Sequence, residues 1–216
     1  METGNNLHRV YSKNNLAETI IGQRLIINFR YDGLTLVAAD PTGKQIVDIG
    51  SCSWLATKDE DQLVENAEEF FEEHNIALQQ AAGIHWLFSV SKCSLLPDIL
   101  HQKGQGHEIL SFTSRLDEGE NVYSDFWTRK DIVGLYALPQ RVHDWAVSRN
   151  STSTIAHISH GLNNLALQQT GRKDYFLLMV SDSFAEFYIA REGKLTFYNQ
   201  FPFDVFEDLL YYLLFT

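Results

Sequence analysis

Residues 24 to 54 alternate between short apolar runs and polar turns. The first run contains Leu25-Ile26-Ile27, the second covers residues 34–39, and the third covers residues 46–54. Asp32-Gly33 separates the first two runs and the segment DPTGK separates the last two, and turns of this composition favour hairpins. The pattern predicts three antiparallel strands that follow one another as a meander.

A similar pattern returns in the segment DYFLLMVSDSFAEFYIAREGKLTFYNQ, residues 174–200. A shift of 150 residues places three identical pairs together: Asp32 on Asp182, Gly43 on Gly193 and Lys44 on Lys194. An internal duplication explains this, because each segment also leads into a helix with an acidic start. The alternative is a pair of unrelated hairpins. We predict that residues 24–54 and 174–201 form matching meanders, each continuing into a larger mixed sheet with helices on its faces.

Residues 57 to 80 have the periodicity of an amphipathic helix. Apolar residues share one face and glutamates the other: Leu63, Ala67, Phe70, Phe71 and Leu78 against Glu65, Glu68, Glu69, Glu72 and Glu73. Thr57 and Glu60 have the spacing of a capping box, which predicts that the helix begins there. We interpret the acidic face as solvated rather than as a metal or partner site, and His74 as a packing or capping residue.

The remaining segments alternate between strand and helix patterns. Strands are predicted over residues 84–97, 107–116, 121–128, 131–138 and 153–159. Helices are predicted over residues 97–104, 139–150, 160–171 and 204–216. Residues 1–20 are polar and aperiodic, and we interpret them as a flexible N-terminal arm.

The charge of the chain argues against nucleic-acid binding. There are 28 acidic and 17 basic side chains, a formal net charge of −11, and Lys and Arg are scattered rather than clustered. The N-terminus lacks the apolar core of a secretion signal, and no run is long enough to span a membrane. We therefore expect a cytosolic protein.

The cysteines and histidines of this sequence are candidates for disulfide formation and metal binding. Cys52 and Cys93 stand apart without CxxC spacing, which favours buried free thiols in a reducing compartment. His143, His157 and His160 could be imagined as a zinc site, but no Cys or carboxylate lies at fixed spacing from them, and capping or packing is the preferred interpretation. We predict no metal site and no catalytic residue.

Two segments carry a resemblance to a known fold family. LPQRVHDWAV, residues 138–147, and GKLTFYNQFPFDVFEDLLYYLL, residues 193–214, resemble the actin-like ATPase superfamily of sugar kinases, chaperone ATPases and pilus-assembly actin homologues. The DVFEDLLYYLLF helix is also similar to an uncharacterised bacterial family assigned that fold. The resemblance implies an α/β protein with mixed sheets and two actin-like, ribonuclease H-like lobes. It places the first lobe at residues 21–138 and the second at residues 139–216. The final strand and the adenosine-side loop that the resemblance implies for the second lobe are missing from residues 139–216.

The resemblance implies that the turn after the first strand of each meander holds the nucleotide phosphates with an Asp and a Gly. Here Asn28 and Arg30 align with those positions in the first turn, and Met179 and Ser181 in the second. A methionine cannot hold a Mg²⁺-bound water, because hard cations need oxygen ligands. The nearest substitutes are the cofactor-binding candidates Arg30, Asp32, Gly33, Asp182 and Ser183. Asp204 replaces the Gly-Gly pair of pilus-assembly relatives and is expected to cap the following helix.

Two function classes follow from these residues. In the first, the protein is a non-catalytic interaction or assembly protein without a cofactor, whose phosphate-binding turns are degenerate. In the second, it is an ATPase or kinase that binds ATP and Mg²⁺ through atypical turns. The role of Arg30 distinguishes the two function classes, because in the second its guanidinium could replace the lost backbone donors to phosphate. The protein partner and the oligomeric state stay open.

Overall fold

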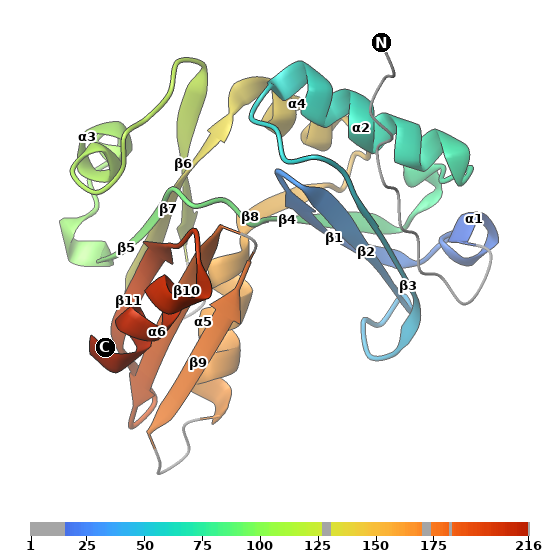
Figure 1. Ribbon diagram of the computed structural model, residues 1–216. Coiled ribbons are helices and arrows are strands. Elements are labelled where there is room, and N and C mark those ends of the chain that lie inside the picture. Colours follow the sequence, from blue (N-terminus) through green and yellow to red (C-terminus); the bar gives the residue numbers. More distant parts are fainter. Residues whose placement is uncertain (1–15, 127–130, 170–173, 182, 216) are drawn as a thin grey trace. The chain divides into compact units, whose positions relative to one another are not determined.

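The computed structural model describes residues 16–126, 131–169, 174–181 and 183–215. These residues form two compact units, which Figure 1 shows in sequence colours. The first unit takes its described residues from Met1–Val90, Asp117–Asn121 and Leu138–Ala156, and the second from Ser91–Leu116, Val122–Ala137 and His157–Thr216. Each unit is therefore assembled from separate stretches of chain, and the division into lobes at residue 138 stays a prediction.

The first unit is built on a five-stranded sheet of order β3-β2-β1-β4-β8. Its strands are β1 (Arg24–Arg30), β2 (Gly33–Ala39), β3 (Ile46–Ser53), β4 (Gly83–Phe88) and β8 (Thr154–His157). Its helices are α1 (Leu16–Thr19), α2 (Glu60–Glu73), the 3-10 turn η1 (Leu78–Gln80) and α4 (Gln140–Ser148). The strands β1, β2 and β3 pair antiparallel in succession, which confirms the first predicted meander, and β4 pairs parallel with β1.

The core of the first unit lies between this sheet and the helices α2 and α4, which cover the same face (Figure 1). Leu25, Ile27 and Phe29 alternate with polar or exposed positions along β1 and are buried on this face. Trp145 of α4 joins the layers, with its ring centroid 5.9 Å from that of Phe29 and 5.2 Å from that of Trp86 in β4. The alternating buried side chains of β1 therefore pack against the apolar faces of two helices.

Helix α2 buries Leu63, Ala67, Phe70 and Phe71 and exposes four of the five predicted glutamates. Glu68 is instead half-buried, where it accepts from the indole N–H of Trp145 and pairs with Arg149.

The start of α2 also differs from the prediction. Asp59 is the N-cap, and its carboxylate accepts hydrogen bonds from the backbone N–H groups of Asp61 and Gln62 at 3.0 Å each. Thr57 instead accepts from the N–H of Asp59. The capping box prediction was wrong because Asp is as good a cap as Thr and lies one residue before the first helical turn. At the other end His74 packs on Phe70 and contacts its carbonyl, as predicted.

Residues 16–20 do not belong to a flexible arm. Leu16–Thr19 form the short helix α1, and the side chain of Ile20 is fully buried. The prediction had taken the polar composition of the preceding residues as typical of the whole segment. Residues 1–15, which the same prediction covered, lie outside the described residues.

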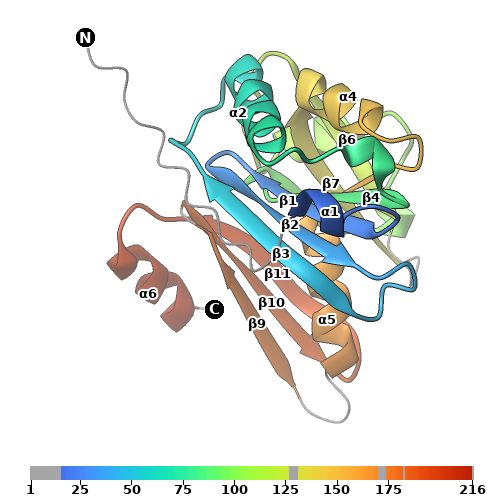
Figure 2. The same ribbon diagram turned by 90° about the vertical axis from the view of Figure 1, so that its right-hand side faces the viewer.

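The second unit contains two three-stranded sheets, of order β5-β7-β6 and β11-β10-β9. The strands are β5 (Cys93–Pro97), β6 (Glu120–Phe126), β7 (Ile132–Pro139), β9 (Tyr175–Val180), β10 (Phe184–Arg191) and β11 (Lys194–Pro202). The helices are the 3-10 turn η2 (Asp98–Leu100), α3 (Gly106–Ser111), α5 (Ile158–Gln169) and α6 (Phe206–Phe215). Helices α5 and α6 cover opposite faces of the sheet β11-β10-β9, as the two views in Figures 1 and 2 show.

The second predicted meander is confirmed, because β10 pairs antiparallel with both β9 and β11. Its continuation into a larger mixed sheet is not found among the described residues, where this sheet has three strands and β9 lies at its edge. The two meanders thus share their strand order and differ in what lies beyond the first strand.

Two other predicted elements were wrong. Residues 106–111 form α3 rather than a strand; Leu110 is fully buried, and the partly buried Ile109 packs against Leu96, Val133 and Leu135. Adjacent side chains point to opposite faces of a strand but only about 100° apart on a helix, so the pair fits a helix better. The apolar run 84–97 is not one strand but two, β4 and β5, which belong to different sheets.

Candidate functional site

The first candidate turn is the two-residue connection between β1 and β2. Arg30 pairs with Gly33, which leaves Tyr31 and Asp32 as the turn. The carbonyl oxygen of Asp32 accepts from the backbone N–H of Trp54 at 2.8 Å. The carbonyl oxygen of Tyr31 accepts from the Trp54 indole N–H at 3.0 Å and from the Thr57 N–H at 3.1 Å. The turn is therefore fixed against the chain that leaves β3.

Gly33 is required by this packing. A Cβ atom on Gly33 would lie 2.3 Å from the carbonyl oxygen of Cys52 and 3.0 Å from the Cα of Ser53. Both neighbours are backbone atoms of β3, so they cannot move aside as a side chain could. The glycine next to the turn lets two strands approach each other closely.

Arg30 points back into its own turn. Its Nε donates to Oδ1 of Asp32 at 2.9 Å and a terminal nitrogen donates to Oγ1 of Thr35 at 3.2 Å. The side chains of Arg30 and Asp32 are 23% and 18% exposed. The structure thus brings together three of the predicted residues, Arg30, Asp32 and Gly33, and it places the guanidinium in an ion pair within the turn.

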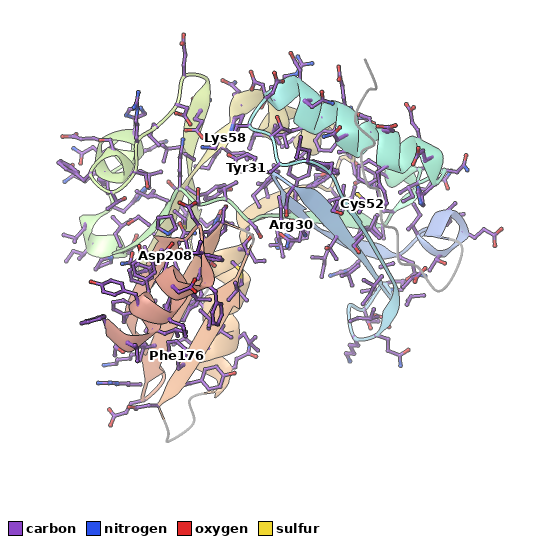
Figure 3. The ribbon with its side chains drawn as sticks, viewed as in Figure 1. Arg30, Tyr31, Cys52, Lys58, Phe176 and Asp208 are labelled. Atoms are coloured by element: carbon purple, nitrogen blue, oxygen red, sulfur yellow. The ribbon has the colours of Figure 1, made fainter. Side chains whose placement is uncertain are left out.

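A pocket of about 600 Å³ adjoins this turn within the first unit. Its lining consists of Tyr31, Lys58, Pro139 and six acidic residues: Asp59, Glu60, Asp61, Asp117, Glu118 and Glu120. Figure 3 marks Arg30, Tyr31 and Lys58 at this end of the unit. Burial, with the carboxylates of Glu120 and Asp117 nearby, raises the pKa of Tyr31 well above its ordinary value. The six carboxylates of the lining independently disfavour a further negative charge in this pocket, because like charges repel.

Sequence reasoning missed this acidic lining. It is assembled from the N-terminal turn of α2 and from residues 117–120, which lie some 55 residues further along the chain. The sequence pattern leaves residues 117–120 between two predicted strands, and nothing in one sequence places this segment next to α2. The available signal was the concentration of carboxylates in both segments.

The second candidate turn joins β9 and β10. Its Asp182 lies outside the described residues. Ser183 is exposed, and its carbonyl oxygen accepts from the N–H of Phe203 at 3.1 Å. Across the same turn the N–H of Ser181 donates to the carbonyl of Phe184 at 2.9 Å. Ser183 belongs to the second unit and the candidates of the first turn to the first unit, so the predicted common site stays a prediction.

Strand positions correct the repeat alignment by one residue in this hairpin. Arg24 and Tyr175 start β1 and β9, and Gly33 and Phe184 start β2 and β10, so the offset is 151 in both strands. Asp32 therefore corresponds to Ser183 rather than to Asp182. The offset of 150 holds at the next turn, where Gly43 and its counterpart Gly193 have φ values of 72° and 75°, in the left-handed region that favours glycine.

The start of α6 is also anionic, but through a different residue from the one predicted. The carboxylate of Asp208, in the first turn, accepts from the backbone N–H groups of Asp204 and Val205 at 3.2 and 3.3 Å. Asp204 contributes its backbone rather than a capping carboxylate to these bonds. The prediction of an acidic helix start was right, but the predicted residue, Asp204, was wrong. A carboxylate in the first turn of a helix, such as that of Asp208, can accept from N–H groups that precede the helix.

The cysteines and histidines behave as structural residues. Cys52 and Cys93 are buried free thiols, as predicted, and burial raises the pKa of Cys52 to about 12. His157 is buried, donates its backbone N–H to Asp125 at 2.6 Å, and contacts Oγ of Ser159 through Nδ1 at 2.8 Å. No group of potential metal ligands is found in the described ranges.

A buried carboxylate in the second unit was not predicted. Glu186 of β10 is fully buried and accepts from the hydroxyls of Tyr188 and Tyr198 at 2.7 and 2.8 Å. It also accepts from Nε2 of Gln200 at 2.6 Å. These three neutral donors satisfy the carboxylate, so the network is a polar core rather than a cavity with free chemistry.

The fold and these sites can be compared with known proteins. The family described as "Protein of unknown function (DUF3822)" matches residues 12–216 of the chain. The chain belongs to the DUF3822 family. Among solved structures, the chain is similar to a Bacteroides thetaiotaomicron VPI-5482 protein with actin-like ATPase fold and unknown function. The TM-score is 0.82 at 15% identity, over 92% of this chain and 77% of that chain. No curated protein sequence matches.

The comparison confirms the predicted actin-like ATPase fold for this DUF3822 member. More distant structures include the PilM–PilN type IV pilus biogenesis complex, with a TM-score of 0.48 at 10% identity over 83% of this chain and 61% of that chain. The Lmo2764 protein from Listeria monocytogenes has a TM-score of 0.40 at 14% identity, over 81% and 49% of the two chains. None of the helices in the described ranges has the length and apolar content needed to cross a bilayer.

Proposed function

We propose that this DUF3822 protein is a non-catalytic interaction or assembly protein that retains an actin-like frame while its phosphate-binding turns have degenerated. The observation that carries the proposal is the chemistry at the β1–β2 turn. Its one guanidinium is paired with Asp32, and the adjoining pocket is lined by six carboxylates. A triphosphate brought to this turn would meet a negative field and no unpaired Arg30.

The second turn supports the same proposal through different residues. Met179 lies where a Mg²⁺-binding oxygen is expected from the resemblance, and the carboxylate of Asp208 in the first turn of α6 accepts from the N–H groups of Asp204 and Val205, just before the helix. A helix N-terminus attracts anions, and a carboxylate already held there repels a phosphate. The proposal includes the predicted cytosolic location, which the two buried free thiols support.

The second candidate function is an ATPase or kinase that binds ATP and Mg²⁺ through atypical turns. The observation that favours it is the position of Arg30 at the end of β1, where a guanidinium can form a bidentate contact with phosphate. For this to happen the Arg30 side chain would have to leave Asp32 and Thr35. The two candidates therefore differ in the state of one ion pair.

Calorimetric titration with ATP and Mg²⁺ tests the choice. We expect no binding heat at millimolar ATP for the wild-type protein and none for Arg30→Ala. Submillimolar binding that disappears in Arg30→Ala would overturn the proposal and establish the second candidate. A thermal unfolding series gives an independent readout, because a ligand at about 100 times its Kd stabilises the native state by about 2.7 kcal/mol.

Asp32→Asn is the matched variant for this experiment. It removes the charge that holds Arg30 and keeps the size of the side chain. If ATP binds to Asp32→Asn but not to the wild type, the Arg30–Asp32 ion pair itself prevents nucleotide binding at the turn. If neither protein binds, the carboxylates of the pocket suffice to exclude the nucleotide.

A further inference from the structure

The carboxyl end of α2 forms one wall of a second pocket in the first unit. This pocket has a volume of about 420 Å³ and lies at the opposite end of α2 from the pocket beside the β1–β2 turn. Its other walls are the connection to η1 and Arg149, the C-cap of α4. Helices α2 and α4 lie side by side on one face of the sheet, as Figures 1 and 2 show. The whole lining belongs to the first unit, so the pocket is a feature of that unit alone.

The floor of this pocket is apolar. Phe71, Ile76 and Leu78 line it, and all three are buried. The ring of Phe71 also stacks on that of Trp145, with 6.4 Å between the ring centroids, which fixes its orientation. Pockets that bind ligands combine such apolar surface with a small number of placed polar groups. The floor can therefore receive methylene groups, and the polar groups of the wall decide which charge accompanies them.

One polar group of the wall, the carboxylate of Glu68, is held in a fixed position. Its Oε1 accepts from the indole N–H of Trp145 at 2.6 Å and pairs with a terminal nitrogen of Arg149 at 2.6 Å. The guanidinium of Arg149 also lies over the Trp145 ring, 5.4 Å from its centroid. A carboxylate has acceptor sites on both oxygens, and these two partners share one of them. Glu68 thus keeps acceptor capacity for a ligand in an oriented carboxylate.

The pocket also has an excess of negative charge. Glu72 lies one helical turn after Glu68, and like charges at this spacing on a helix repel each other. Arg149, the one basic residue of the described lining, balances one of these two charges. The last turn of α2, residues 70–73, contains no basic residue, although the helix dipole favours a cation there. The lining therefore favours one further positive charge.

We propose that this pocket binds a lysine or arginine side chain of a protein partner. The methylene stem of that side chain lies on the apolar floor, and its cationic group lies between Glu68 and Glu72. A long basic side chain suits the pocket because it joins an apolar stem to a charged end. The inference goes beyond the proposed function, because the pocket binds a basic side chain whether or not the β1–β2 turn excludes nucleotide.

The occupant is a protein surface rather than a free amine, because acidic side chains continue beyond the pocket. Glu65, Glu69 and Glu73 are exposed on the same helix, and the formal net charge of the chain is −11. A partner with several basic side chains complements such a surface and is steered towards it. The sequence pattern alone favours a solvated acidic face, because it does not show that Glu68 is oriented beside an apolar floor.

Backbone amide NMR shifts of the full chain test the proposal, with acetyl-arginine amide as the probe. At millimolar concentration the probe is expected to shift the amides of Glu72, Ile76 and Ala77 to saturation. Acetyl-citrulline amide has a neutral side chain of almost the same shape, and it is expected to give no saturable shift. Methylguanidinium has the charge without the stem, and it is expected to bind about tenfold more weakly than the arginine probe because it buries fewer methylene groups.

Substitutions of two exposed glutamates provide the matched variants. Glu72→Gln removes a carboxylate from the pocket and is expected to weaken binding of the arginine probe about threefold. Glu65→Gln removes the same charge from the same helix outside the lining, and it is expected to leave the affinity unchanged. Glu72→Lys places a cation in the pocket itself and is expected to abolish binding. Both side chains are exposed, so these variants keep the fold.

Several results would overturn the proposal. An arginine probe that gives no saturable shift, or a citrulline probe that binds equally well, would show that the pocket does not select a cation. Equal weakening by Glu65→Gln and Glu72→Gln would show a general attraction to the acidic helix instead of a built pocket. Methylguanidinium that binds as tightly as the arginine probe would make the occupant a small cation rather than a side chain.

Discussion

The two meanders of this protein have the same backbone and different surroundings. β1-β2-β3 and β9-β10-β11 are both antiparallel in chain order, and each is followed by a helix. In the first, β1 is an inner strand and Leu25, Ile27 and Phe29 are buried. In the second, β9 is the edge strand of the described sheet, and Phe176 and Val180 are about half exposed. A repeated strand pattern therefore specifies local pairing, whereas burial depends on what the rest of the unit supplies.

The interiors differ as well. Glu186 of β10 occupies the ladder position that Thr35 occupies in β2, since Glu186 pairs with Met179 and Thr35 with Asn28 at the common offset of 151. Thr35 accepts from Arg30 beside the candidate turn, whereas Glu186 is buried among tyrosines under α5. The corresponding residue thus contacts a turn in the first unit and belongs to a polar core in the second. Strands with the same pairing therefore hold side chains with different roles.

The largest expected effect separates the two helices that follow the meanders. Phe70 of α2 is fully buried, and Phe70→Ala is expected to lower the free energy of unfolding by about 3 to 5 kcal/mol, through lost burial and the cavity left behind. Leu214 of α6 is 82% exposed, and Leu214→Ala is expected to change it by less than about 0.5 kcal/mol. Urea unfolding of both variants measures the difference, and equal losses would contradict the comparison.

The next effect concerns the polar core of the second meander. Glu186→Ala leaves the hydroxyls of Tyr188 and Tyr198 and the amide of Gln200 without their acceptor. Each unsatisfied buried donor costs about 1 to 3 kcal/mol, and partial rearrangement reduces the sum, so a loss of about 2 to 4 kcal/mol is expected. Glu186→Gln keeps an acceptor oxygen and should lose less than half as much. A full loss in both variants would show that charge, rather than hydrogen bonding, holds the network.

Local patterns predicted the local part of this structure. The period of two and the Asp-Gly turn were enough for the first meander, and they brought Arg30, Asp32 and Gly33 together because those residues are neighbours in the chain. The helix α3 was missed because six residues offer too little periodicity to tell a helix from a strand. The acidic pocket and the Glu186 network were missed for another reason. Their members come from separate segments, and the contacts between them exist only after folding.

A pH dependence of the stability is expected from Asp125 in the second unit. Burial raises the pKa of Asp125 to about 7, although its carboxylate accepts the N–H of His157. A carboxyl whose folded pKa lies above its unfolded value of about 3.9 contributes stability below that value and loses it as the pH rises toward 7. Asp125→Asn keeps an acceptor and cannot ionise.

Urea midpoints at several pH values measure this effect. The stability of Asp125→Asn relative to the wild type is expected to rise between pH 5 and 7, by at most about 1.4 kcal/mol per pH unit, and to level off above pH 7. Asp144, exposed in the first unit with its pKa lowered by His143, provides the control. Asp144→Asn should show no such rise. A constant difference between Asp125→Asn and the wild type would mean that Asp125 is ionised throughout.

The smallest expected effect uses a glycine in each unit. Gly161 lies within α5, and a Cβ atom there would meet nothing within 4 Å. Gly161→Ala is expected to stabilise the protein by about 0.5 to 1 kcal/mol, because alanine loses less backbone entropy in a helix. Gly33→Ala should have the opposite sign, since its Cβ would lie 2.3 Å from the carbonyl oxygen of Cys52. Thermal unfolding of the two variants measures both signs. A stabilising Gly33→Ala would show that β3 can move away from Gly33, and that the packing next to the β1–β2 turn does not require a glycine.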